Sequence, residues 1–148
     1  MNFSRRAHDD RGAAAVEMAI VTPLLLLLLF GIIQYGMLFH SMQAASATAR
    51  DAAHQAAHGI EDCAPYIDDV SKDAKDNGVP GATPWTLEMI YDLTPTPSNQ
   101  FGTVRTTLTY YPENAVPFIP MPSQLVQTAI APVEDISAVK VPSCHVTP

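Results

Sequence analysis

Residues 18–39 read MAIVTPLLLLLLFGIIQYGMLF and carry no charged side chain. About 20 apolar residues are enough to cross a bilayer as a helix that rises about 1.5 Å per residue. Inside lipid a helix satisfies its own backbone polar groups, so a helix is the structure expected here. Pro23 lacks a backbone N–H and is expected to kink or loosen this helix near its start. The stretch therefore predicts one membrane-spanning helix surrounded by membrane lipid.

Basic residues set the expected direction of this helix. Arg5, Arg6 and Arg11 precede the apolar stretch, and by the positive-inside tendency they place the N-terminus in the cytoplasm. The region after the helix is then extracytoplasmic. A cleaved secretory signal peptide is the competing interpretation, with small-residue cut sites ending at Ala47 or Ala49. A retained anchor is favoured, because the apolar run is long for a signal peptide and helix-forming sequence follows it.

The residues just before the span carry a second pattern. Residues 11–18 read RGAAAVEM, so a basic leader ends in Gly12 and Glu17 stands five residues further on. This arrangement closely resembles the type IV prepilin processing site. The resemblance implies that a prepilin peptidase cuts between Gly12 and Ala13 on the cytoplasmic side and leaves the helix attached. The mature chain would then begin at Ala13.

The wider sequence is similar to the TadE/TadG-like pseudopilins of tight-adherence (Flp-type) pilus systems. The similarity covers about the first 60 residues and includes Gly12, Glu17, Pro23 and the run ARDAA at residues 49–53. Two positions depart from the family's usual pattern: Met18 replaces an aromatic residue, and Gln34 replaces an acidic one. The resemblance implies a pilin-like fold whose partners are a prepilin peptidase, other pilins and inner-membrane pilus assembly proteins.

Glu17 has a physical argument of its own. A carboxylate at the centre of a membrane helix costs about 2.5 to 3.5 kcal/mol on insertion scales. One helical turn separates it from Ala13, which places it about 6 Å from the new amino end. There it can pair with an α-ammonium group, and the family role is pairing with the amine of a neighbouring subunit. The alternative is a carboxylate at headgroup level with no specific role.

The helix is expected to continue out of the membrane to His58, where Gly59 ends it. One side of this extension is made of small residues: Ala44, Ala45, Ala49, Ala52, Ala53, Ala56 and Ala57. Two uses of that side stay open, namely close packing against other helices and a plain anchor stalk.

The remaining chain predicts a small α+β domain. The expected elements are a helix over 65–77, an antiparallel pair of strands over 85–93 and 103–111, a short element over 124–130 and a third strand over 136–141. Residues 112–122 are too rich in proline for regular structure, although Phe118 and Ile119 are expected to be buried. In pilin-like folds such a sheet packs against the outer half of the long helix.

We therefore divide the chain into three parts. Residues 1–12 form a cytoplasmic leader that is cleaved, residues 13–58 form the transmembrane and extended helix, and residues 59–148 form an exported soluble domain. Cys63 and Cys144 are the two cysteines of the chain, and neither has metal-ligand spacing around it. In an exported domain they can form one disulfide.

Other function classes find little support. The net charge is −7, which argues against nucleic-acid binding. No nucleophile motif or phosphate-binding loop is present, so we expect no enzyme and no cofactor. His54 and His58 share a helix face, with Glu61 or Asp62 as a conceivable third ligand, but surface histidines are favoured over a metal site. A pseudopilin or minor pilin is thus the first hypothesis. The alternative is an envelope-anchored ligand- or protein-binding module with an uncleaved signal anchor.

Overall fold

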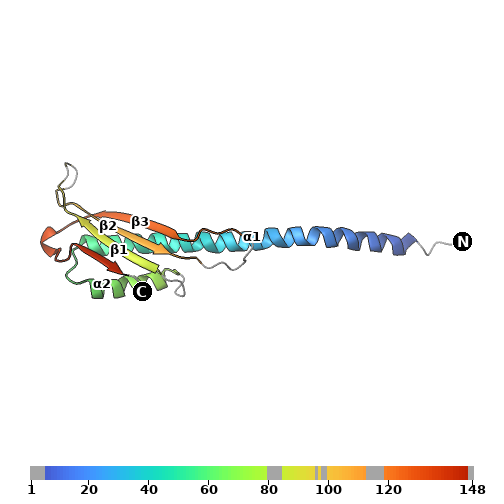
Figure 1. Ribbon diagram of the computed structural model, residues 1–148, viewed down its shortest axis with the longest axis horizontal. Coiled ribbons are helices and arrows are strands. Elements are labelled where there is room, and N and C mark those ends of the chain that lie inside the picture. The colour runs from blue at the N-terminus through green and yellow to red at the C-terminus, as the bar shows by residue number, and fades with distance from the viewer. Residues whose placement is uncertain (1–5, 80–84, 96, 98–99, 113–118, 147–148) are drawn as a thin grey trace.

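The computed structural model describes residues 6–79, 85–95, 97, 100–112 and 119–146, with the backbone alone at 6–11 and 146. One long helix dominates it, and a small domain is packed against the C-terminal half of that helix (Figure 1). The N-terminal half extends well beyond the domain, so the molecule is elongated (Figure 1).

Helix α1 runs without interruption over Arg6–Ala57, as the sequence predicts for the span and its extension. Pro23 lies inside it. One residue earlier, the Thr22 hydroxyl donates to the carbonyl oxygen of Met18 at 2.6 Å. The helix ends before Gly59, whose φ of 91° few other residues adopt. A Cβ at Gly59 would also lie 2.7 Å from the carbonyl carbon of Ala138. Conformation and close approach therefore both require glycine at this turn.

A second helix, α2, covers Cys63–Asp76. It begins two residues before the predicted start at Pro65, because Asp62 is its N-cap and accepts a hydrogen bond from the Ala64 N–H at 3.2 Å. Gly78 follows its end with a φ of 82°. Val70 and Ala74 are buried, as the predicted apolar face requires.

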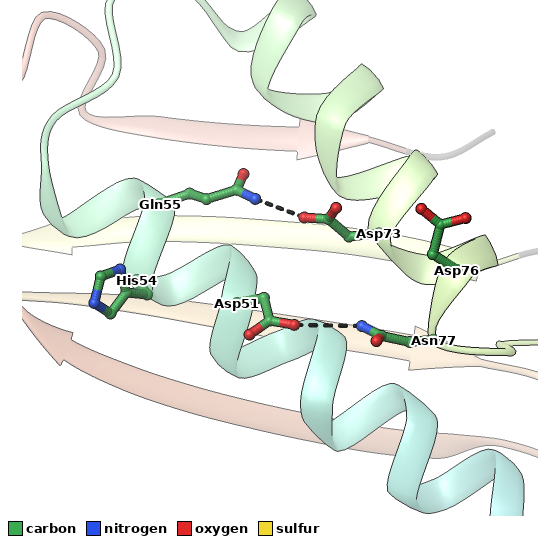
Figure 2. Close-up of a pocket in the computed structure, with 6 residues that line it drawn as sticks. All are labelled: Asp51, His54, Gln55, Asp73, Asp76 and Asn77. Atoms are coloured by element: carbon green, nitrogen blue, oxygen red, sulfur yellow. Dashed lines mark hydrogen bonds between the residues drawn. The ribbon is translucent and has the colours of Figure 1, made fainter.

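The strands form one antiparallel sheet in the order β3-β2-β1-β4. Their bounds are β1 Trp85–Asp92, β2 Thr103–Tyr110, β3 Leu125–Pro132 and β4 Ser143–Val146. The predicted pair β1 and β2 is confirmed, with Trp85 opposite Tyr110 and Asp92 opposite Thr103. Helices α1 and α2 lie side by side on one face of this sheet (Figure 2). The α+β fold class expected from the sequence is thereby confirmed.

Two expectations in the C-terminal third were wrong or incomplete. Residues 136–141 do not form a strand: Ile136–Ala138 is a short 3-10 helix, because the Asp135 carboxylate accepts hydrogen bonds from the Ser137 N–H and hydroxyl, at 2.8 and 2.6 Å. The last strand is β4 instead. The short element predicted over 124–130 is the full eight-residue strand β3, which pairs with β2 along its whole length. Ile119 is buried as expected, whereas Phe118 lies outside the described residues.

The small-residue side of α1 forms one side of the hydrophobic core. All seven predicted alanines are buried, and most of them pack with Leu87, Met89, Val104 and Leu108 of the sheet. Alanine side chains allow a helix to approach a sheet closely. Within the described part of the chain, the alanines pack against the protein's own sheet and against helix α2.

Close approach lets side chains from three elements donate to α1 carbonyl oxygens. The Tyr91 hydroxyl donates to Ala56 at 2.5 Å, Tyr66 donates to Ala52 at 3.1 Å, and Thr106 donates to Ala49 at 2.7 Å. These bonds are buried, and buried polar groups that find partners stabilise a fold by about 1 kcal/mol each. They fix the position of the domain along α1.

Candidate functional site

The predicted processing site lies on the exposed N-terminal part of α1. Gly12, Ala13 and Glu17 are all exposed and all helical. A Cβ added at Gly12 would meet nothing within 4 Å, so the fold of the chain does not require glycine there. Glu17 makes no hydrogen bond or ion pair with the rest of the described chain. Both residues are therefore available to a partner.

The C-terminal end of the apolar stretch is covered by the chain itself. The Tyr35 hydroxyl donates to the Pro120 carbonyl oxygen at 3.0 Å, across 85 positions of sequence. Gln34 and Leu38 are buried, so the contact between the domain and α1 begins inside the predicted span. Sequence reasoning missed this contact, because it joins the membrane stretch to a proline-rich segment without periodicity.

Gln34 is one of the two departures from the usual family pattern, and its burial gives a reason for it. Its side chain is 1 % exposed, and neither amide atom has a hydrogen-bond partner in the described part of the chain. A carboxylate in the same place would be a buried charge, which costs much more than a buried neutral amide. The amide is therefore the less costly polar residue at this position.

The structure brings Cys63 and Cys144 together as a disulfide with a Cα–Cα distance of 5.7 Å. The bridge joins the first residue of α2 to β4, 81 positions apart in sequence. Cys144 is buried and Cys63 packs against the core. The bridge therefore ties the edge of the sheet to the helix layer.

A polar cleft of about 350 Å³ separates α1 from α2 (Figure 2). It is lined by Asp51, His54 and Gln55 of α1 and by Asp73, Asp76 and Asn77 at the end of α2. The Gln55 amide donates to Asp73 at 2.6 Å, and the Asn77 amide donates to Asp51 at 3.3 Å. These bonds cross the cleft and connect the two helices, which is a structural role.

His54 lies on α1, and His58 directly follows the end of that helix. The rings of His54 and His58 are 5.2 Å apart, and His58 Nδ1 lies 3.1 Å from a Glu134 carboxylate oxygen on the surface. The conceivable third ligands are engaged elsewhere, since Glu61 pairs with Lys140 and Asp62 caps α2. Among the residues that the structure describes, no group of three or more metal-ligating side chains lies together.

Two tyrosines of the helix–sheet interface have altered acidities. Burial raises the pKa of Tyr91 to about 12. Burial, together with the nearby Tyr91, also raises the pKa of Tyr66. Loss of either proton would leave a phenolate facing a helix carbonyl oxygen, so both groups stay protonated in the folded protein near neutral pH.

Taken together, these features define a class of protein: an α+β, pilin-like chain built on one long N-terminal helix. Within the described residues, one helical stretch, Gly12–Ala57, is long and apolar enough to cross a membrane, which is consistent with a single membrane anchor. The family model described as TadE-like protein matches residues 12–54, so this segment of the chain is similar to the TadE-like family. No curated protein and no solved structure matches the chain. The similarity suggests a role in Tad pilus assembly, in association with that machinery.

Proposed function

We propose that this chain is a membrane-anchored pseudopilin, or minor pilin, that acts in the assembly of a tight-adherence-type pilus or secretion system. The observation that carries the proposal is the coincidence of three features. The TadE-like match begins at Gly12, Glu17 follows it on the same helix, and a sheet domain packs on the outer half of that helix.

The first step of the proposed function is processing between Gly12 and Ala13 by a prepilin peptidase. Glycine inside a helix costs about 1 kcal/mol relative to alanine. Nothing in the described chain uses the space beside Gly12, so internal packing gives no reason for it. A peptidase subsite that accepts only a small side chain does give a reason. Removal of residues 1–12 then leaves Ala13 as the new amino end.

The second step is association through Glu17. The carboxylate is exposed and lies about one helical turn, or 6 Å, from the new ammonium group. In a bilayer an unpaired carboxylate is costly, and pairing with the ammonium group of a neighbouring pilin lowers that cost. Glu17 thus provides an assembly contact to other pilins, which inner-membrane assembly proteins would bring together.

The proposed topology follows from charge. The basic leader stays in the cytoplasm, residues 13–58 anchor the chain as a single span with its extension, and residues 59–148 form the extracytoplasmic domain. The disulfide between Cys63 and Cys144 suits an oxidising compartment outside the cytoplasm.

Intact-mass analysis of the full chain, extracted from membranes of cells that contain a prepilin peptidase, tests the proposal. A mature chain beginning at Ala13 is expected. Gly12→Leu should enter the membrane but keep its leader, whereas Gly36→Leu, at a helical glycine with equally open surroundings, should be processed normally. A mature start after Ala47 or Ala49 would contradict the pilin interpretation. An uncleaved chain would favour the envelope-anchored binding module.

A further inference from the structure

Strand β3 forms one edge of the sheet. In an antiparallel pair, alternate residues direct their N–H and C=O groups toward the partner strand, and the residues between them direct these groups away. Within the described part of the chain, β3 pairs with β2 alone. About four residues of this eight-residue strand therefore direct backbone polar groups out of the sheet. Such a row of donors and acceptors is a template for a further strand.

The features that usually protect an edge strand are missing from the middle of β3. Edge strands are commonly protected by charge, by proline, by a bulge or by short length. Residues 114–133 carry no charged side chain, the proline of β3 is its last residue, and the pairing with β2 is continuous. The opposite edge, β4, has four residues and follows Pro142. β3 is therefore the edge that is better able to accept a strand.

The exposed side chains of β3 indicate which strand fits. Val126 and Ile130 are 50 % and 58 % exposed, and the exposed Thr128 lies between them. All three lie on the face of the sheet opposite the helices, since Ala129 pairs with Thr106, whose hydroxyl donates to α1. Apolar side chains beside Val126 and Ile130 and a hydroxyl beside Thr128 would form favourable cross-strand pairs. A charge at those positions would lose water without gaining a partner.

A second copy of the chain fits this edge poorly, and this step rests on the proposed function, in which α1 spans the membrane. β3 runs in the same direction as α1 (Figure 1). Its start follows Pro120, which bonds to Tyr35, and its end precedes Glu134, whose N–H donates to Ala57. Antiparallel pairing of β3 with its own copy would therefore reverse the anchor of that copy.

The other symmetric or edge-to-edge pairings of two copies also fail. Parallel pairing around a two-fold axis would place N–H groups opposite N–H groups, whereas a parallel ladder needs donors opposite acceptors. Pairing of β3 with β4 of a copy would rotate the anchor of that copy by about 80 to 100°, because each of four strand steps adds a twist of about 20 to 25°. One planar membrane would not hold both spans.

We propose that β3 accepts a strand from a different protein chain. This strand is an extended, uncharged segment with apolar side chains at two positions four residues apart and a small polar residue midway between them. It would pair antiparallel with β3 and add a fifth strand to the four of the sheet. Main-chain hydrogen bonds supply the affinity of such a contact, and side chains at alternate positions supply its specificity.

A synthetic peptide with the sequence of residues 123–133, SQLVQTAIAPV, has this chemistry and serves as the probe. Without an anchor it is free to lie antiparallel to β3, with Val126 opposite Ile130. Fluorescence anisotropy of the labelled peptide measures its binding to the full chain in detergent micelles. At a free peptide concentration of about ten times its Kd, hydrogen exchange at the outward amides of Leu125–Pro132 should slow by about tenfold.

Two isoleucine variants locate the contact. Ile130→Lys places a charge on the edge strand and should weaken peptide binding by about fivefold or more. Ile90→Lys is the matched control, because Ile90 is also exposed on the same face and also lies opposite Arg105. It lies on β1, two strands away from the edge, so this variant should bind like the wild type. Equal urea midpoints would show that both variants are folded.

The remaining outcomes separate this inference from the proposed function. Unchanged exchange in β3, or equal loss of binding in both variants, overturns the inference. Association of the chain with itself in the absence of peptide, lost in Ile130→Lys, assigns the edge to a second copy and also overturns it. The mature mass is measured on the same protein, and a start at Ala13 without peptide binding leaves the pseudopilin proposal intact.

Discussion

Opening the disulfide between Cys63 and Cys144 is expected to destabilise the sheet domain strongly. The bridge fixes the start of α2 to β4, a strand of four residues at one edge of the sheet. When it is open, β4 is held by its pairing with β1, from Ser143 opposite Ile90 to Val146 opposite Leu87. Reduction therefore acts on the sheet edge and on the entropy of the unfolded chain.

The magnitude follows from the 81-residue separation of the two cysteines. The chain-entropy relation gives about 4.5 kcal/mol at 25 °C for a loop of that length. Small domains are stable by about 5 to 15 kcal/mol in total, so the bridge supplies a large share. With a urea slope of about 2 kcal/mol per M, reduction should lower the unfolding midpoint by about 2 M.

Urea unfolding of the full chain in detergent micelles measures this effect through Trp85, the one tryptophan of the protein, which lies partly buried at the start of β1. The oxidised and reduced protein are compared, and Cys63→Ala checks that the reductant acts through the bridge. Hydrogen exchange in the reduced protein should accelerate first at Ser143–Val146. Equal midpoints for both forms, or alkylation of both thiols without reductant, would refute the reasoning.

Three further predictions concern assembly, pH and packing. Glu17→Ala should still insert and be cleaved but should lose association with other pilin-type subunits, measured by cross-linking beside the mature mass; association at the wild-type level by the cleaved variant would assign no assembly role to the carboxylate. The pKa of Tyr91 is raised to about 12 and that of Tyr66 is raised too, above an unfolded value of about 10. The contribution of these two tyrosines to folding stability should therefore be fully present below about pH 10 and be lost as the pH rises through about 12. The urea unfolding midpoint should be lower at about pH 11 than at about pH 8, and equal midpoints would contradict this. Ala49→Leu should cost about 1 to 3 kcal/mol by overpacking the helix–sheet interface, whereas Ala47→Leu, at a partly exposed position, should cost less; equal thermal stability of the two variants would count against the close approach.

The long helix, its apolar stretch and its alanine-rich side could be predicted from the sequence, because each has a pattern of its own. An uncharged run of 22 residues marks the span, and alanines at helical spacing mark the side that the sheet covers. The strands β1 and β2 were predictable for the same reason, since Leu87, Met89 and Tyr91 alternate with polar or exposed residues. Periodicity reveals an element when one of its faces is buried along its whole length.

Elements that depend on distant partners were not predictable in this way. Strand β4 has four residues and becomes a strand through β1 and through the bridge to Cys63. The apolar residues of 136–141 suggested a strand, but the Asp135 side chain instead holds the backbone in a 3-10 turn. The contact between Tyr35 and Pro120 joins positions 85 residues apart. Local pattern carries no information about such pairings.

One continuous helix connects the proposed processing site at Gly12 to the sheet domain. Helix α1 is continuous from Arg6 to Ala57, and from Gly12 to Ala57 it rises about 68 Å. In the C-terminal half of this helix, the side chains of Tyr66, Tyr91 and Thr106 donate hydrogen bonds to helix carbonyl oxygens and so hold the domain directly against the helix. A contact that orients the helix near Gly12 must therefore orient the domain as well. If Glu17 pairs with a neighbouring subunit as proposed, that pairing also sets which face of the sheet domain the neighbour meets.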